Sequence, residues 1–214
     1  MPDRQLPHDD STELFSQAAA SLAAEKSQNY PKTFLYVGRF AKQKGIDLLL
    51  AAYDIYKKTY QGTWGLTCIG NGPMQQDLEA AAANDQQIHI EAFLLQPELV
   101  KRAQAAGGFV LPSRYEPWGV VAHEFSAAGL PLIFSEYVGA RQQFLIDGLN
   151  GYTFYNESAQ DLAYKMHLLS NQSSEQLVQM GLISTQLAQR TTPEITAASL
   201  MSVLSAKLPR PTQS

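Results

Sequence analysis

A regular alternation of two patterns runs along this chain from residue 33 and limits what it can fold into. Short apolar runs occur at residues 33–37, 64–69, 88–93, 109–111, 132–134 and 151–154. Between them, apolar residues recur at helical spacing, as in Ile46, Leu49, Leu50 and Tyr53. Strands that alternate with helices form right-handed βαβ units. The sequence therefore predicts the α/β class, with a mainly parallel sheet flanked by helices.

We expect one Rossmann-like domain over residues 31–208, preceded by a polar segment, residues 1–30, that is too short to be a domain. In that segment Asp10 and Glu13 predict a capping box, and the apolar residues that follow at helical spacing are Leu14, Phe15, Ala18 and Leu22. We expect this short helix to pack on the main domain; the alternative is that it docks a partner chain. Thr192 and Pro193 predict the start of the last helix.

The composition excludes several classes of protein. The net charge is −4, from 20 acidic and 16 basic side chains. This balance argues against nucleic acid as the main partner, because phosphate binding usually requires a basic face. The single cysteine, Cys68, allows no disulfide within the chain and favours a reducing compartment. Since the N-terminus has no secretory signal and no apolar run approaches the ~18 residues of a membrane helix, we expect a cytoplasmic protein without a membrane span.

The loops after the expected strands are the places to look for chemistry, because ligands bind beyond the carboxyl ends of the strands in a parallel sheet. The first loop runs from Gly38 to Gly45 and carries the cations Arg39, Lys42 and Lys44. It lacks the G-x-G-x-x-G pattern of dinucleotide-binding folds. A cationic loop that opens a helix can still bind phosphate through its side chains and the helix N–H groups. A solvated basic loop explains the same residues equally well.

The second expected strand ends in Gly70-Asn71-Gly72-Pro73. Its two glycines allow tight backbone turns near a ligand, and Pro73 suits the start of a helix. On this segment alone, a plain turn is the favoured interpretation.

Glu124 is an unusual residue for its place in the helix expected over residues 118–128. At about 100° per residue, Val120, Val121, Ala127 and Ala128 form an apolar face with Phe125 at its edge, and Glu124 lies in the middle of that face. A buried ionised carboxylate is very costly without partners. Glu124 must therefore meet a cation, hydrogen-bond donors or a ligand, and ribose hydroxyls are natural donors. The alternative is a structural glutamate bonded to backbone amides.

Glu116 precedes Pro117 at the start of the same helix. The helix dipole favours an acid there, which is the structural explanation. The functional explanation is a carboxylate that holds sugar hydroxyls. The N–H groups near Gly119, Val120 and Val121 can meet a diphosphate. One helix start would then present a carboxylate, an anion site and a second carboxylate in series, which is the order of sugar, diphosphate and ribose in one molecule.

Together these segments resemble the retaining glycosyltransferases of the GT-B fold, in the large family numbered four. Glu116 and Glu124 match its E-x7-E pattern. The further matches are G-R-x-x-x-x-K-G from Gly38, the G-x-G-P turn from Gly70, the block from Ser113 to Pro131, and D-G-x-N-G from Asp147. The similarity covers about residues 33–170 in the family's order. It implies a fold like the C-terminal, donor-binding half of such an enzyme.

The resemblance implies a role for each matching residue. Arg39 and Lys44 would neutralise the donor diphosphate, and Glu116 would bind the transferred sugar, so these three form the expected catalytic set. The expected nucleotide-binding residues are Glu124 at the ribose, Phe93 near the base, and Gly38, Gly72, Gly119, Val120 and Val121. The donor would be a UDP-, GDP- or ADP-sugar, transferred with retention of configuration and without a metal ion or other cofactor. Neutralising the departing diphosphate is the electrostatic stabilisation that such a reaction requires.

Three features limit what the resemblance implies. Gln143 stands where many relatives have a glutamate, near the expected sugar contacts. His123 points away from the apolar stripe of its helix, so we expect His123 to be structural or exposed. Only the second of the family's two domains is recognisable, so an acceptor-binding domain or subunit would complete the site. The alternative functions are a non-catalytic nucleotide-sugar-binding or regulatory module and one subunit of a split glycosyltransferase. An oxidoreductase of the same fold class is disfavoured by the missing glycine pattern.

Overall fold

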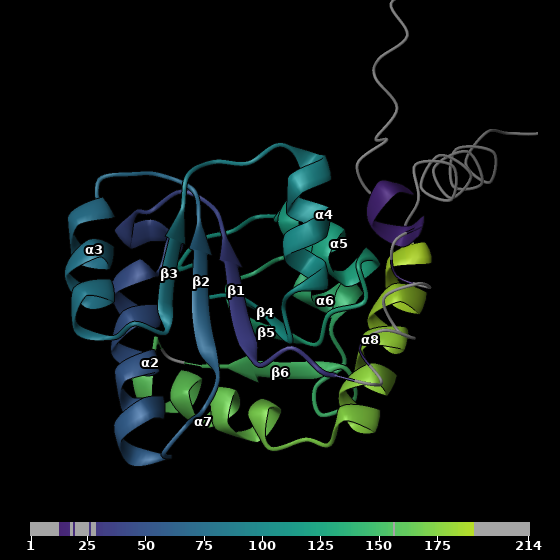
Figure 1. Ribbon diagram of the computed structural model, residues 1–214. Coiled ribbons are helices and arrows are strands. Elements are labelled where there is room, and N and C mark those ends of the chain that lie inside the picture. The colour runs from purple at the N-terminus through teal and green to yellow at the C-terminus, as the bar shows by residue number, and fades with distance from the viewer. Residues whose placement is uncertain (1–12, 18, 20–25, 27–28, 156, 191–214) are drawn as a thin grey trace, which may run out of the picture.

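The computed structural model describes residues 13–17, 19, 26, 29–155 and 157–190. Its sheet consists of β1 (Thr33–Val37), β2 (Gly65–Ile69), β3 (Ile88–Glu91), β4 (Gly108–Leu111), β5 (Leu132–Ser135) and β6 (Gly151–Phe154). All paired strands are parallel, in the order β3-β2-β1-β4-β5-β6 (Figure 1). This is the strand order of the doubly wound Rossmann fold. The predicted α/β class and Rossmann-like parallel sheet are confirmed.

Helices lie on both faces of the sheet (Figure 1). One face packs against α2 (Ile46–Thr59), α3 (Gln75–Asn84) and α7 (Ala159–Ser170). The other packs against α4 (Gln96–Gln104), α5 (Val120–Ala127) and α6 (Arg141–Phe144), while α8 (Ser174–Gln189) contributes to both cores and contacts α5. A short 3-10 helix, η1 (Lys42–Lys44), precedes α2. Because helices cover both faces, every residue of β4 and β5 is buried.

The predicted apolar face of α5 is wrong in two details. Val120 is 57% exposed, because α5 begins at this residue, two residues later than expected, beyond the carboxyl end of β4. Phe125, expected at the margin of the face, is fully buried and stacks on Phe109 with ring centroids 4.3 Å apart. On the side of α5 away from the sheet, Phe15 packs edge-on against Phe125, with ring centroids 5.4 Å apart.

The N-terminal segment packs on the main domain where it is described. Residues 13–17 are helical, and Phe15 is fully buried. Lys26 Nζ donates hydrogen bonds to the carbonyl oxygens of Ala103 and Ala106, at 3.1 and 2.7 Å, at the C-terminal end of α4. Burial lowers the pKa of Lys26 to about 7. Other expected features, at Asp10, Ala18, Leu22, Thr192 and Pro193, lie outside the described residues.

The chain leaves β1 and β4 toward opposite faces of the sheet, so the two strands form the topological switch point at which ligands bind in such folds. Two backbone segments meet there. Gly45 has a φ of 75°, and a Cβ atom on it would lie 2.1 Å from the carbonyl oxygen of Pro112. The loop after β1 therefore approaches the segment after β4 more closely than any side chain allows.

We predict that Gly45→Ala lowers the free energy of unfolding by ~3 kcal/mol or more, because strain at positive φ adds to a backbone clash. Gly148→Ala is the matched control, since Gly148 has a φ of 76° but no atom within 4 Å of its Cβ position. The control should lose only ~1 kcal/mol. Urea denaturation measures both variants, and equal losses would show that the contact with Pro112 does not matter.

Candidate functional site

A cavity of about 650 Å³ opens at the carboxyl edge of the sheet, beside the switch point. The loops after β1, β2 and β3 line it together with the first turns of α4 and α5. Its lining includes Gly38, Arg39, Phe93, Leu95, Val121 and Glu124. The position agrees with the edge at which the sequence places the site.

A second cavity, of about 240 Å³, adjoins the first and shares Gly38, Arg39 and Val121 with it. Its other predicted site residues are Lys44, Glu116, Gly119 and Val120. The fold thus gathers every predicted site residue except Gly72 around two adjoining cavities. Gly72 packs against the loop after β1 instead, where a Cβ atom would lie 2.4 Å from the Phe40 carbonyl oxygen. Its role in binding stays a prediction.

A salt bridge joins the two loops at the switch point. Lys44 Nζ lies 2.5 Å from Glu116 Oε2, and the two side chains are 29% and 13% exposed. Arg39, on the same loop as Lys44, is exposed and forms no ion pair within the described part of the chain. Among the cations that line the two cavities, Lys44 is thus paired, while Arg39 is exposed.

The N-terminus of α5 separates the two carboxylates. Gly119 caps it with a φ of 88°, so close to Glu116 that a Cβ atom would lie 3.0 Å from its Cγ. Val120 and Val121 follow in the first turn and line the smaller cavity, which Glu116 also lines. Glu124 lies one turn further on, is only 6% exposed and lines the larger cavity. The predicted burial of Glu124 is confirmed.

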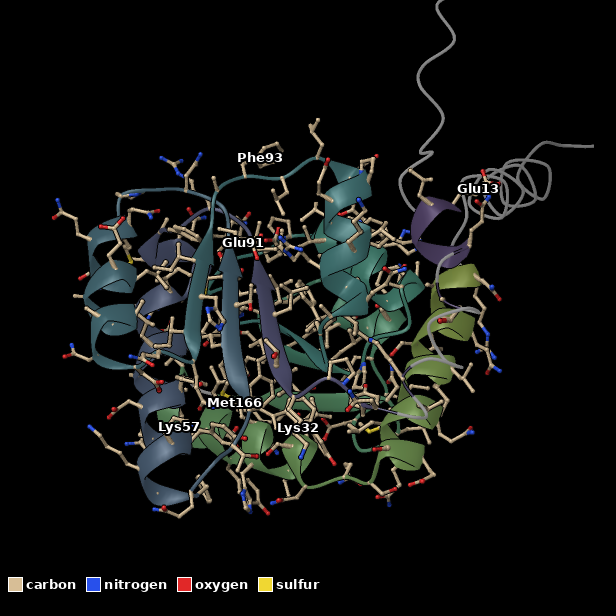
Figure 2. The ribbon with its side chains drawn as sticks, in the orientation of Figure 1. Glu13, Lys32, Lys57, Glu91, Phe93 and Met166 are labelled. Atoms are coloured by element: carbon tan, nitrogen blue, oxygen red, sulfur yellow. The ribbon has the colours of Figure 1, made fainter. Side chains whose placement is uncertain are left out.

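Phe93 lies outside the sheet. The strand expected to reach residue 93 ends at Glu91, and Phe93 projects from the β3–α4 loop, where it is 69% exposed (Figure 2). It lines the larger cavity with Leu95, the neighbouring apolar side chain of this loop, which is 68% exposed. These two side chains offer an apolar wall to the larger cavity.

Tyr36 is a structural support of the site that sequence reasoning missed. Its hydroxyl donates a hydrogen bond to the Arg39 carbonyl oxygen at 2.9 Å, and the ring lies beneath Gly38. Burial, then the charges of Cys68 and Glu116, raise the pKa of Tyr36 well above its usual range, so it stays a neutral donor. The signal was available, because a buried tyrosine needs a partner for its hydroxyl.

His123 and Gln143 lie away from both cavities. His123 Nε2 is 3.1 Å from the Ala188 carbonyl oxygen, and the ring stacks on Phe144 with centroids 4.7 Å apart. These contacts support the structural role expected for His123. Gln143 is exposed, and neither cavity includes it.

The described residues offer neither a metal cluster nor a membrane span. They contain no cluster of three or more His, Cys, Asp or Glu side chains arranged to hold a metal ion. No helix among them has the length and apolar character needed to cross a membrane.

Comparison with known proteins adds a family assignment to this geometry. The model of the family described as Glycosyl transferases group 1 matches residues 19–182. Glycogen synthase from Mycobacterium tuberculosis is 34% identical over 161 residues, which are 67% of this chain and 38% of that protein. The chain thus spans well under half the length of this curated relative.

Solved structures show the same fold. A pneumococcal O-GlcNAc transferase, GtfA, in complex with UDP and GlcNAc superposes with a TM-score of 0.69 and 25% identity, over 82% of this chain and 36% of GtfA. HepE from Anabaena, in complex with UDP and glucose, has a TM-score of 0.67 and 16% identity, over 90% of this chain and 55% of HepE. The predicted likeness to the C-terminal part of GT-B glycosyltransferases is confirmed.

We predict that Tyr36→Phe lowers the free energy of unfolding by ~1 kcal/mol, because the Arg39 carbonyl loses its hydrogen bond. Tyr53→Phe is the control, since the Tyr53 hydroxyl donates a similar bond to the Trp64 carbonyl oxygen, at 2.9 Å, away from both cavities. Both variants should lose similar stability in urea. Only Tyr36→Phe should also accelerate hydrogen exchange at the Phe40 amide, and an unchanged rate would refute its role in holding the loop.

Proposed function

Since the chain belongs to the glycosyl transferases group 1 family, we propose that it is the donor-binding part of a glycosyltransferase. The reaction is transfer of a hexose or similar sugar from a nucleoside diphosphate sugar, with retention of configuration. One observation carries the proposal: buried Glu124 and the Lys44–Glu116 pair lie in adjoining cavities on either side of the α5 N-terminus.

Each part of the donor has a matching group in this arrangement. The larger cavity takes the nucleoside, with the base against Phe93 and the ribose hydroxyls donating to Glu124. Arg39, Lys44 and the first N–H groups of α5 take the diphosphate, because cations and a helix N-terminus favour anions. Glu116 takes hydroxyls of the transferred sugar.

The same groups supply the chemistry. Bond cleavage leaves negative charge on the β-phosphate, and fixed cations beside that position stabilise it more in the transition state than in the bound donor. Lys44 and Arg39 hold that position at the switch point without a metal ion. Glu116 and Arg39 then differ in role: the carboxylate orients the sugar, and the guanidinium stabilises the leaving group.

The acceptor half of the enzyme is proposed to cover the rim of the smaller cavity. Three exposed aromatic side chains are close to Glu116 in sequence or adjoin Val138, its backbone bridge partner: Tyr115 at 62%, Trp118 at 43% and Tyr137 at 45%. Exposed aromatic side chains of this kind suit an apolar interface. The alternative, a module that binds the donor without transferring the sugar, would bind nucleotide-sugar but show no transfer after a separate acceptor domain is added.

Calorimetric titration with UDP, GDP and ADP tests the proposal. We expect saturable binding of one of these nucleotides and at least ~10-fold weaker binding by Glu124→Gln, which loses charge-assisted hydrogen bonds to the ribose. Glu79→Gln, a change on the exposed surface of α3, is the control and should bind as the wild type does. Failure of the folded wild-type chain to bind any of the three would refute the proposed donor site.

A second prediction separates the two carboxylates. Glu116→Gln should reduce affinity for the hexose conjugate of the bound nucleotide more than affinity for the bare nucleotide, by a factor of ~5 or more, because only the conjugate presents sugar hydroxyls to it. Glu124→Gln should reduce both affinities by the same factor. Parallel losses in Glu116→Gln would contradict its assigned contact with the sugar.

A further inference from the structure

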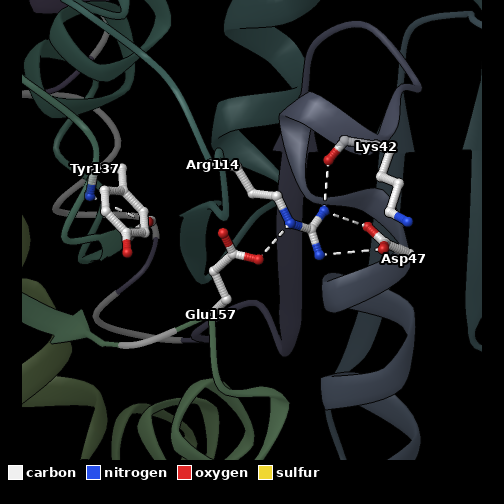
Figure 3. A network of polar contacts seen from close by, with 6 residues as sticks. Lys42, Asp47, Arg114, Tyr137 and Glu157 are labelled. Atoms are coloured by element: carbon white, nitrogen blue, oxygen red, sulfur yellow. Dashed lines mark hydrogen bonds and ion pairs between the residues drawn. The ribbon is translucent and has the colours of Figure 1, made fainter.

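Arg114 binds two separate segments of the chain with its guanidinium group, the stretch from η1 to the start of α2 and the β6–α7 connection (Figure 3). Nη1 and Nη2 donate to the two carboxylate oxygens of Asp47 at the start of α2, at 2.6 and 3.1 Å. Nη1 also donates to the Lys42 carbonyl oxygen of η1, at 2.5 Å. Nε donates to Glu157 Oε2 on the β6–α7 connection, at 2.7 Å. One side chain thus joins loops that are far apart in the sequence.

These contacts involve residues before and after Lys44 in the sequence. Besides the bonds from its side chain to Lys42 and Asp47, the Arg114 backbone N–H donates to the Gln43 carbonyl oxygen at 2.9 Å. Lys44 therefore lies between residues that are held on both sides. Arg114 itself is two residues before Glu116, the partner of Lys44. The same arginine therefore contacts residues on both sides of Lys44 and lies two residues from Glu116, the other end of the 2.5 Å salt bridge.

We propose that Arg114 is a positioning residue that sets the Lys44–Glu116 geometry for the donor diphosphate and its sugar. The inference rests on the proposed function for the identity of the ligand. The Lys44–Glu116 geometry itself is present without any ligand. Arg114 lines neither cavity, so it acts through Lys44 and Glu116 rather than by touching the donor. The planar guanidinium is needed because a lysine ammonium cannot form the forked contact with Asp47 and reach Glu157 at once.

This network stabilises the fold as well as positioning residues. The side chains of Arg114, Asp47 and Glu157 are 21%, 34% and 46% exposed. Isolated ion pairs in contact with solvent contribute little to stability, but a bidentate arginine–carboxylate pair within a network contributes more, so stability alone does not test the positioning role. Partial burial acts to raise the pKa of Asp47, but the hydrogen bonds and charge of Arg114 outweigh it, so that this pKa lies below its usual value. Asp47 is therefore ionised and paired with Arg114 near neutral pH.

The first test measures the coupling between Lys44 and Glu116 without any ligand. A double-mutant cycle with Lys44→Met and Glu116→Gln is measured by urea denaturation, in the wild-type chain and in Arg114→Met. We expect the coupling to fall at least twofold in Arg114→Met and less in Arg114→Lys. Arg102→Met is the matched control, because it removes another arginine–glutamate pair, to Glu91 at 2.7 Å. An unchanged coupling in Arg114→Met would overturn the proposal.

The second test measures affinity for whichever of UDP, GDP and ADP the wild-type chain binds. The folded Arg114→Met variant should bind this nucleotide at least ~10-fold more weakly than the wild type. In a chain that already carries Lys44→Met, adding Arg114→Met should weaken binding less than twofold. An equal loss in both backgrounds would mean that Arg114 acts elsewhere and would overturn the proposal. If the wild-type chain binds none of the three, the donor site is refuted, while the coupling cycle still decides whether Arg114 positions the pair.

Discussion

The backbone contact between Gly45 and Pro112 sets the distance between the two loops on which the candidate site is built. Parallel strands place the ends of β1 and β4 side by side, but they do not determine how closely the following loops approach. At Gly45 a missing side chain and a left-handed backbone let the loops touch. Lys44 and Glu116 can then form a salt bridge although 72 residues separate them in the sequence.

The packing of α5 determines where Glu124 and the helix N-terminus lie in the candidate site. The helix is held between the sheet and α8, and its buried residues include Phe125 and Ala122, so its axis cannot shift to relieve an unfavourable group. Glu124 is carried into the wall of the larger cavity by this packing, and Gly119 brings the α5 N-terminus against Glu116. The hydrophobic core thereby fixes where the two carboxylates and the helix dipole lie relative to one another.

The sequence predicts the sheet, its parallel strands and the place of the candidate site at their carboxyl ends, because these depend on local patterns. The burial of Glu124 follows from helical spacing, and the grouping of Arg39, Lys44 and Glu116 follows from their places after β1 and β4. The exposure of Val120 did not follow, because the exact first residue of α5 depends on the cap at Gly119. Arg114 and Tyr36 were missed for another reason: their partners are distant or are backbone atoms, which periodicity does not report.

The Lys44–Glu116 pair also bears on how a diphosphate would enter the proposed site. Glu116 is only 13% exposed on its side chain, so an unpaired carboxylate there would be costly. In the free chain Lys44 removes that cost. When a diphosphate arrives, its charge competes for Lys44, and sugar hydroxyls can replace the ammonium as donors to Glu116. If the proposed contacts hold, the bare nucleotide offers no such replacement, and only the complete nucleotide-sugar would leave both Lys44 and Glu116 with a partner.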